Sequence, residues 1–101
     1  MYKIKDVYKF KSGMDGKEYL FGTVVKHYKY EKDHHIITSE VVDFDKKKLI
    51  AKTKSGSIYE IENIFENRIE FEKFIDENFG DKICGKFGFE TYADYYKHII
   101  N

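Results

Sequence analysis

The chain has 101 residues, the length of one domain, and its 36% of charged residues sum to a formal net charge of zero. Nine tyrosines and nine phenylalanines without tryptophan predict an aromatic-rich core, and the regular recurrence of apolar residues excludes a disordered chain. The absence of proline is typical of a chain built from regular elements joined by short turns.

Short apolar and β-branched runs, separated by turns rich in glycine or charged residues, predict five strands in the first 62 residues. In the first run, apolar residues at even positions alternate with lysines at odd positions, which is the period of a half-buried strand. Gly22 interrupts the second run and indicates a bulge or a close approach between strands. The expected strands are residues 2–11, 17–30, 34–44, 49–54 and 58–62.

The period of the apolar residues becomes helical in the last third of the chain. Asn67, followed three positions later by Glu70, is typical of a helix N-cap, and we expect a helix over residues 68–79. Residues 81–89 predict a loop or a short edge strand. Apolar residues within 92–100 recur at the spacing of one helix face and predict a second amphipathic helix.

These elements together predict an α+β fold. We expect a five-stranded antiparallel sheet, strongly curved or closed into a small SH3-like barrel, followed by two C-terminal helices. Residues 1–101 are expected to form a single domain, with a β-meander over residues 1–63 and a helical part over residues 64–101 packed on the sheet.

The single cysteine and the absence of long apolar runs bear on the compartment. Cys84 has no second cysteine with which to form an internal disulfide or a cysteine-based zinc site, which favours a reducing compartment. The first 20 residues contain no apolar stretch of signal-peptide length, and no later run is long enough to span a membrane. We therefore expect a cytoplasmic protein of a bacterial host cell, without a membrane partner.

The charges are divided unevenly along the chain. Residues 1–59 contain 13 lysines and 8 acidic residues, whereas residues 60–101 contain 5 basic and 10 acidic residues. This asymmetry predicts either a nucleic-acid-binding face or an attraction between the two halves, within one molecule or head-to-tail in a homodimer. Arg68 is the single arginine, which favours the second interpretation because specific nucleic-acid readers rely on arginine.

Three of the four histidines, His27, His34 and His35, lie close together in the sequence. If residues 31–33 form a three-residue hairpin loop, His27 and His35 share one face of the hairpin, while adjacent His34 points to the other face. Two imidazoles are too few for a structural zinc site. We therefore expect a solvated hairpin tip that acts as a contact surface, with neither a metal nor a cofactor.

The candidate binding residues lie on strands and turns that are rich in lysine and tyrosine. Four lysines at odd positions of the first strand are expected on one side, and the two tyrosines at 28 and 30 share a face. Lysine with tyrosine holds nucleotides by phosphate attraction and stacking, while tyrosine is also favoured at protein interfaces. We expect the turn at 54–57 to be an ordinary hairpin turn, with weak binding of an anion by its amides, hydroxyls and lysine as the alternative. The candidates are Lys9, Lys11, Tyr28, Tyr30, His34, His35, Lys54, Ser55, Ser57 and Tyr59.

The sequence contains no convergent set of catalytic residues. Glu72 and Asp76 are spaced to share one face of a helix, but no histidine or metal ligand is spaced to join them. Cys84 has no base nearby in the sequence, although a reactive thiolate needs an electropositive setting. We therefore expect a protein that is not an enzyme.

The stretch "IITSEVVDFDKKKLIAKTKSGSIYEIE", residues 36–62, resembles the two-hairpin region of small uncharacterised proteins from bacteriophages and mobile elements. Small bacteriophage proteins of this composition include inhibitors of host defence that bind a protein or sequester a nucleotide. The resemblance assigns no catalytic residues. Its matching positions are Ile36 or Ile37, Thr38, Ser39, Thr53, Ser55, Gly56, Ser57 and Tyr59.

The residues and the resemblance together predict a small non-catalytic binding protein. We expect a bacteriophage-type accessory protein that binds and inhibits a host protein, as anti-defence proteins do. The alternative is a module that sequesters a nucleotide or binds single-stranded nucleic acid with the lysine- and tyrosine-rich sheet face.

Overall fold

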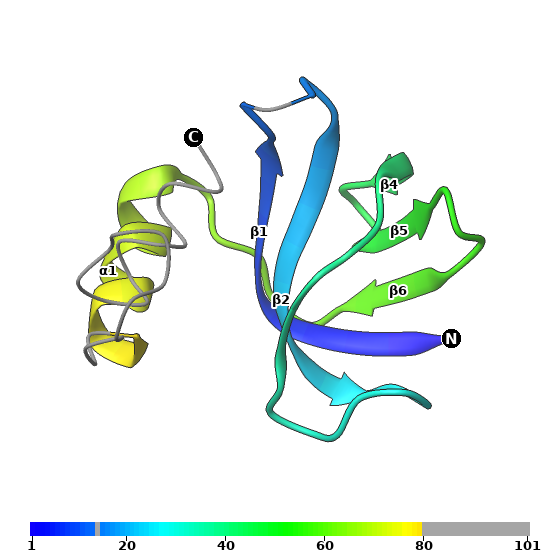
Figure 1. Ribbon diagram of the computed structural model, residues 1–101, viewed down its shortest axis with the longest axis horizontal. Coiled ribbons are helices and arrows are strands. Elements are labelled where there is room, and N and C mark those ends of the chain that lie inside the picture. Colours follow the sequence, from blue (N-terminus) through cyan, green and yellow to red (C-terminus); the bar gives the residue numbers. More distant parts are fainter. Residues whose placement is uncertain (14, 80–101) are drawn as a thin grey trace.

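The computed structural model describes residues 1–13 and 15–79, which form six strands and one helix (Figure 1). Two long strands, β1 (Tyr2–Lys11) and β2 (Glu18–Lys26), come first and are joined by a turn. The later elements are shorter strands and a helix: β3 (His35–Ile37), β4 (Val41–Asp45), β5 (Ile50–Thr53), β6 (Ile58–Ile61) and α1 (Arg68–Asn78).

The six strands form one mixed sheet in the order β3-β2-β1-β6-β5-β4. β1 pairs antiparallel with β2 and parallel with β6, so that residues 2–4 lie beside residues 59–61. The prediction of a five-stranded antiparallel sheet followed by two helices is therefore wrong. The sheet has a sixth strand and a parallel pair, and the described residues contain one helix. The second expected helix, residues 92–100, and the loop or edge strand expected at residues 81–89 lie outside the described residues.

The sixth strand arises because the run expected as one strand, residues 34–44, is divided at Thr38. The Thr38 hydroxyl accepts the N–H of Leu20 at 3.2 Å and donates to the Ser39 carbonyl at 2.9 Å. The Thr38 N–H also donates to the Leu20 carbonyl at 2.9 Å, after which the chain leaves β2 and Val41 begins β4. Because apolar residues lie on both sides of Thr38, the periodicity of the sequence does not predict this break.

The sheet is strongly curved, because its two edge strands follow one another in the sequence. With strands about 4.8 Å apart, a flat six-stranded sheet would place its edges about 24 Å apart. The chain from Ile37 to Val41 can cover at most about 15 Å. The sheet must therefore bend until its two edges approach each other at residues 38–40, as Figure 1 shows.

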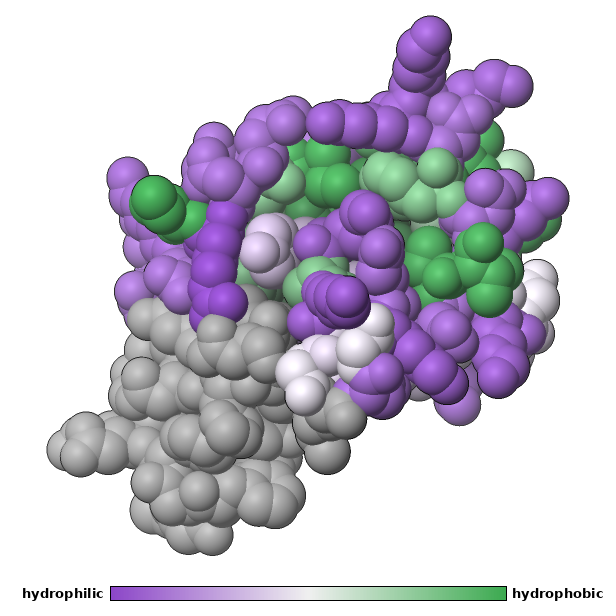
Figure 2. Space-filling view, turned by 90° about the horizontal axis from the view of Figure 1, so that it is seen from above, coloured by the Kyte–Doolittle hydropathy of each residue, from purple (hydrophilic) through white to green (hydrophobic). Residues whose placement is uncertain are grey.

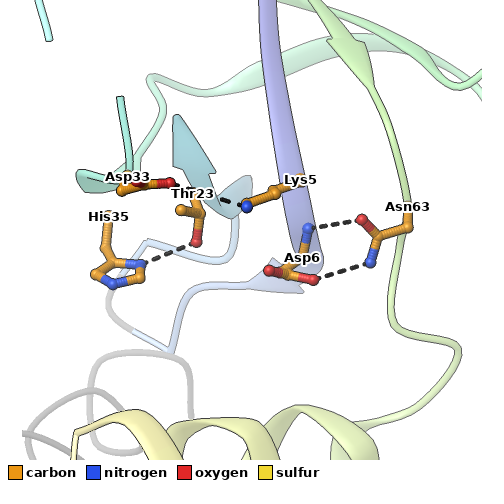
Figure 3. Close-up of polar contacts among 6 residues, drawn as sticks. All are labelled: Lys5, Asp6, Thr23, Asp33, His35 and Asn63. Carbon is orange, nitrogen blue, oxygen red and sulfur yellow. Dashed lines mark hydrogen bonds and ion pairs between the residues drawn. The ribbon is translucent and has the colours of Figure 1, made fainter. Parts of the chain in front are cut away.

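A bulge at Asp6 reverses the alternation of β1. Asp6 has a φ of 51°, in the left-handed region, and the register between β1 and β2 shifts around it. The Asp6 N–H donates to the Asn63 side-chain oxygen at 3.1 Å, and the Asn63 amide nitrogen donates to the Asp6 carboxylate at 3.0 Å (Figure 3). As a result, Ile4 before the bulge and Val7 after it both enter the same core, although their positions differ in parity.

The sheet buries apolar side chains on both faces, in two separate cores. Helix α1 covers the outer face of β1 and β2, where the Phe71 ring stacks on Tyr8 at 4.4 Å and meets Phe21 edge-on at 5.1 Å. Seen from the end with the β1–β2 turn, hydrophilic side chains surround patches of apolar ones (Figure 2). The inner core contains Ile4, Val7, Leu20, Ala51, Tyr59 and Ile61, and the outer core contains Phe10, Phe21, Phe71 and Ile75.

Helix α1 begins at the N-cap that the sequence predicts. The Glu70 N–H donates to the Asn67 side-chain oxygen at 3.0 Å, and the Glu66 N–H donates to the Glu70 carboxylate at 3.2 Å. Phe71 and Ile75 are buried on one face, as their spacing indicates, whereas Ile69 is 79% exposed. No helix within the described residues is long and apolar enough to cross a membrane.

Candidate functional site

Five aromatic side chains gather where β1 begins and β2 ends, and we name them the tyrosine–histidine patch: Tyr2, His27, Tyr28, Tyr30 and Tyr59. The His27 imidazole stacks on the Tyr2 ring, with centroids 3.9 Å apart and planes 20° apart. The Tyr28 ring stacks on His27 at 5.3 Å, and the Tyr30 ring lies 4.9 Å from His27. Tyr59 lies 5.5 Å from Tyr2. His27 is therefore the centre of the patch.

The orientation and charge of His27 follow from its position in the loop after β2. The N–H of Lys29 donates to His27 Nδ1 at 3.0 Å, so this nitrogen is deprotonated. Burial lowers the pKa of His27, and the nearby Lys29 charge lowers it further. The imidazole is therefore neutral at pH 7 and stacks as an uncharged ring.

The rings of the patch range from buried to almost fully exposed. Tyr59 is 6% exposed and belongs to the inner core, whereas Tyr30 is 38% exposed and Tyr28 is 82% exposed. Burial raises the pKa of Tyr59, so its hydroxyl stays protonated near neutral pH. The exposed rings of the patch are therefore joined to a buried ring, Tyr59, that is part of the inner core.

A cluster of hydroxyl groups lies beside the patch, and we name it the hydroxyl cluster: Ser39, Thr53, Ser55 and Ser57. The Ser55 hydroxyl oxygen lies 2.9 Å from that of Ser39, 3.1 Å from that of Thr53 and 3.5 Å from that of Ser57. The tight β5–β6 turn needs Gly56, whose φ is 90°. Because hydroxyl protons rotate, these groups can donate to a ligand or accept from it.

The pocket between the patch and the hydroxyl cluster has a volume of about 370 Å³. Ligand sites commonly measure about 300–1,000 Å³, so the volume suits a small ligand or one side chain of a partner. Lys29 supplies a positive charge, and none of the described lining residues is acidic. The lining residues are His27, Tyr28, Lys29, Tyr30, Ile36, Ile37, Thr38, Ser39, Ser55, Ser57 and Tyr59.

Half of the candidate binding residues named from the sequence come together around this pocket. Tyr28 and Tyr30 arrive from the loop after β2, and Ser55, Ser57 and Tyr59 arrive from the β5–β6 hairpin. The curvature of the sheet and the parallel pairing of β1 with β6 bring these segments together. Neither feature is visible in a strand pattern, so the sequence named the residues without predicting that they meet.

Two members of the tyrosine–histidine patch were not among the binding candidates. Tyr2 was expected only as one apolar residue of a strand, and His27 was considered only as a metal ligand. Tyr2 packs against the inner core, and the His27 ring stacks on Tyr2. The available signal was an aromatic residue near each strand end, which is too common a pattern to single them out.

Lys9 and Lys11 lie away from the pocket, at the other end of β1. Because the bulge at Asp6 reverses the alternation, they face the side opposite to the two lysines that precede it, and the expected row of four lysines does not form. Lys9 Nζ pairs with the Glu18 carboxylate at 2.9 Å and lies 5.2 Å from the centre of the Phe44 ring.

Lys54 is exposed in the β5–β6 turn, beside the hydroxyl cluster. Its N–H donates to the Glu40 carbonyl at 2.8 Å. With Ser39 and Ser55 it lines a second, more open pocket of about 440 Å³. Lys17 and Glu40, which also line that pocket, pair with each other at 3.9 Å. The two pockets therefore share the two serines.

The predicted hairpin tip has a different register, which separates the histidines. A three-residue loop at residues 31–33 would pair His35 with Lys29, but His35 pairs with Thr23 because β2 ends at Lys26 and residues 27–34 form a longer connection. His35 Nδ1 lies 2.9 Å from the Thr23 hydroxyl (Figure 3), and its ring meets Phe79 edge-on at 4.5 Å. Burial lowers the pKa of His35.

The three histidines expected at one hairpin tip do not converge. His27 belongs to the patch, His35 lies between β2 and the end of α1, and His34 is exposed while its carbonyl accepts the Val24 N–H at 2.7 Å. Within residues 1–13 and 15–79, no group of three or more His, Cys, Asp or Glu side chains is placed to hold a metal ion. Cys84 lies outside the described residues.

Comparison with known proteins identifies no family for this chain. No protein-family model matches the chain, and no curated protein or solved structure matches it. A function must therefore be inferred from the patch, the hydroxyl cluster and the pocket between them.

Proposed function

We propose that this protein is a non-catalytic binding protein and that the tyrosine–histidine patch is its contact surface for another protein. The observation that carries the proposal is the Tyr28 ring, which is 82% exposed yet stacked on His27 at 5.3 Å. Tyrosine offers a large contact area at low conformational cost, and it is enriched among the residues that dominate binding energies. An exposed tyrosine that is already held in place suits that role.

The support beneath Tyr28 strengthens the proposal. His27 stacks on Tyr2, and Tyr2 lies next to Tyr59 on the parallel pair of β1 and β6, so the exposed ring is linked to the inner core through two layers of rings. A surface that is ordered before binding loses less entropy when it binds.

The chemistry of His27 favours binding over catalysis. A neutral imidazole with Nδ1 engaged by the Lys29 N–H carries its proton on Nε2. Neither nitrogen then offers a free lone pair to act as a general base. The titratable ring at the centre of the patch thus serves as a stacking surface.

We further propose that the partner is a protein of a bacterial host, which this chain inhibits as a bacteriophage-type accessory protein by covering a surface that the host protein needs. This step rests on the resemblance of residues 36–62 to small bacteriophage proteins. Most positions of that resemblance line the pocket beside the patch, among them Ser39, Ser57 and Tyr59. The resemblance and the geometry therefore concern the same surface.

Capture from a bacterial lysate tests the contact. The full chain is immobilised as wild type, as Tyr28→Ala and as Ile69→Ala, a matched control because Ile69 is 79% exposed on α1, outside the patch. We expect a specific host protein, identified by mass spectrometry, on the wild-type and Ile69→Ala columns and its loss from the Tyr28→Ala column. Equal retention on all three columns would contradict the proposal.

The alternative function, binding of nucleic acid along the sheet face, depended on a continuous row of lysines. The bulge at Asp6 places the lysines of β1 on two faces, and Lys9 and Lys5 pair with Glu18 and Asp33, at 2.9 and 3.8 Å. A strand of nucleic acid is held by a groove that follows its backbone. The sheet face therefore supports this alternative less well than the pocket supports a smaller ligand.

A further inference from the structure

We propose that the pocket between the tyrosine–histidine patch and the hydroxyl cluster binds one nucleotide unit, with its base stacked on Tyr28 and its phosphate at the serine hydroxyls. This inference goes beyond the proposed protein contact, because it assigns a small ligand to the pocket rather than a partner to the exposed rings. The two proposals share Tyr28, but the hydroxyl cluster belongs to the second alone.

The patch side of the pocket offers flat, uncharged rings. Tyr28 leaves most of its surface free, and the neutral His27 ring on which it stacks is tilted from it by 19°. Every nucleobase has a π face, so stacking on tyrosine is tolerant of base identity. Lys29 Nζ lies 5.5 Å from the centre of the Tyr30 ring, which keeps a positive charge close to the stacking surface.

The hydroxyl cluster offers hydrogen-bond donors for an anion. The Thr53 hydroxyl donates to the Ser57 carbonyl at 3.4 Å, while the protons of Ser39, Ser55 and Ser57 can turn toward a ligand. A phosphate oxygen is a stronger acceptor than a neighbouring hydroxyl because it is charged. The serine hydroxyls can therefore exchange contacts among themselves for contacts with a phosphate.

The charges around the pocket agree with a phosphate in this position. Lys29 lines the pocket itself, and Lys54 lines the neighbouring pocket that shares Ser39 and Ser55. A phosphate at these serines would lie in one pocket that a lysine lines and beside a second pocket that another lysine lines. The acidic residue of that neighbouring pocket, Glu40, is already paired with a lysine. A planar ring joined to an anion fits the two sides of the pocket better than either group alone.

The nucleotide unit has two sources, a free mononucleotide or one nucleotide within a single strand. The probes are AMP, CMP, GMP and UMP, a six-residue oligothymidylate, and adenosine and inorganic phosphate as half-ligands. We expect the amide signals of residues 27–30, 39 and 55–59 to shift in NMR titrations with a mononucleotide, and adenosine or phosphate alone to bind at least about tenfold more weakly. Tighter binding of the oligonucleotide than of UMP identifies the single strand as the source, and equal or weaker binding identifies the free nucleotide.

Variants then separate this pocket from the protein contact. Tyr28→Ala is expected to weaken nucleotide binding about 5- to 100-fold, the range found when a stacking ring is removed. Ser57→Ala and Ser55→Ala, which keep the tyrosine rings, are expected to weaken it at least about fivefold while leaving capture of the host protein unchanged. Ile69→Ala serves as the control for both measurements, and well-dispersed amide spectra confirm that each variant is folded.

Three results would overturn the nucleotide site. These are the absence of shifts with all four mononucleotides, shifts centred on the lysines at 46–48 instead of the pocket, and serine variants that bind as wild type does. In each of these cases, loss of host-protein capture by Tyr28→Ala would still support the protein contact. Conversely, nucleotide binding without any captured protein would leave the pocket site intact and overturn the protein contact alone.

Discussion

At the scale of single residues, Asp6 decides which side chains of β1 face the core. A positive φ is unfavourable for a residue with a Cβ atom, although aspartate tolerates it better than most. At 51°, Asp6 stays in this conformation because the Asn63 side chain contacts both its N–H and its carboxylate, while the Asn63 carbonyl accepts the Val7 N–H at 3.1 Å. Asn63 therefore acts as a clamp on the bulge.

Removing this clamp should destabilise the fold. We expect Asn63→Ala to lower the free energy of unfolding by about 1–3 kcal/mol, because the Asp6 N–H loses its acceptor in a strained conformation. Asp6→Asn is the matched control, since asparagine also tolerates a positive φ and keeps an acceptor for the Asn63 amide. Urea unfolding of both variants measures the difference, and equal stabilities of wild type and Asn63→Ala would argue against the clamp.

The imidazoles of His27 and His35, both partly desolvated, should make stability depend on pH. The pKa values of His27 and His35 are lowered in the folded state, chiefly by burial, while the unfolded value is about 6.5. Their contribution to stability is therefore complete above about pH 6.5 and is lost as the pH falls through the folded pKa values. Protonation of His27 also breaks its bond from the Lys29 N–H.

Urea unfolding at pH 7.5 and pH 5.0 measures this effect while most carboxylates remain charged. We expect a lower free energy of unfolding at pH 5.0. His27→Phe keeps a ring to stack on Tyr2 but cannot be protonated, so the decrease should be smaller in this variant. An unchanged decrease would show that His27 does not contribute.

At the scale of elements, the fit between β1 and β2 depends on Gly22. A Cβ atom at this position would lie 3.1 Å from Ile4 Cδ1, 3.3 Å from Ile4 Cβ and 3.3 Å from Val7 Cγ2. Gly22 is thus the close approach that the sequence indicated, while the bulge lies opposite it in β1. The bulge brings two core residues, one from each side of Asp6, against the same glycine.

Filling this space should separate the strands. We expect Gly22→Ala to lower the free energy of unfolding by about 1–3 kcal/mol, as overpacking of a close-packed core commonly does. Ile4→Val removes the nearest atom, so the double variant Gly22→Ala/Ile4→Val should be less destabilised than the sum of its single changes. Thermal or urea unfolding of wild type, the two single variants and the double variant completes this double-mutant cycle. If the two changes in stability simply add, position 22 and Ile4 are not in direct contact.

The elements themselves were largely predictable, whereas their pairing was not. Alternation placed β1 correctly, and the Asn67 cap placed α1, because both signals are local. The division at Thr38 depends on its contact with Leu20, which is distant in the sequence. The parallel pairing of β6 with β1 likewise depends on residues separated by more than fifty positions. Local patterns carry no information on such contacts, so part of the site was named from the sequence and its assembly was not predicted.

At the scale of the whole molecule, the curved sheet separates two surfaces. Helix α1 covers the outer face of β1 and β2, while the tyrosine–histidine patch packs on the inner core where β1 begins. Within the described residues, four ion pairs each join two side chains of the same half of the chain. Lys5–Asp33, Lys9–Glu18 and Lys17–Glu40 pair within the first half, and Arg68–Glu72 pairs within the second.

The central claim is that the exposed part of the patch is the contact surface for a host protein. Its most direct test is the dissociation constant of the captured partner, purified and measured by calorimetry against wild type, Tyr28→Ala and Ile69→Ala. We predict that Tyr28→Ala binds at least about tenfold more weakly, as expected for a central aromatic contact, and that Ile69→Ala binds as wild type does. Unchanged affinity in Tyr28→Ala, with the fold intact, would contradict the claim.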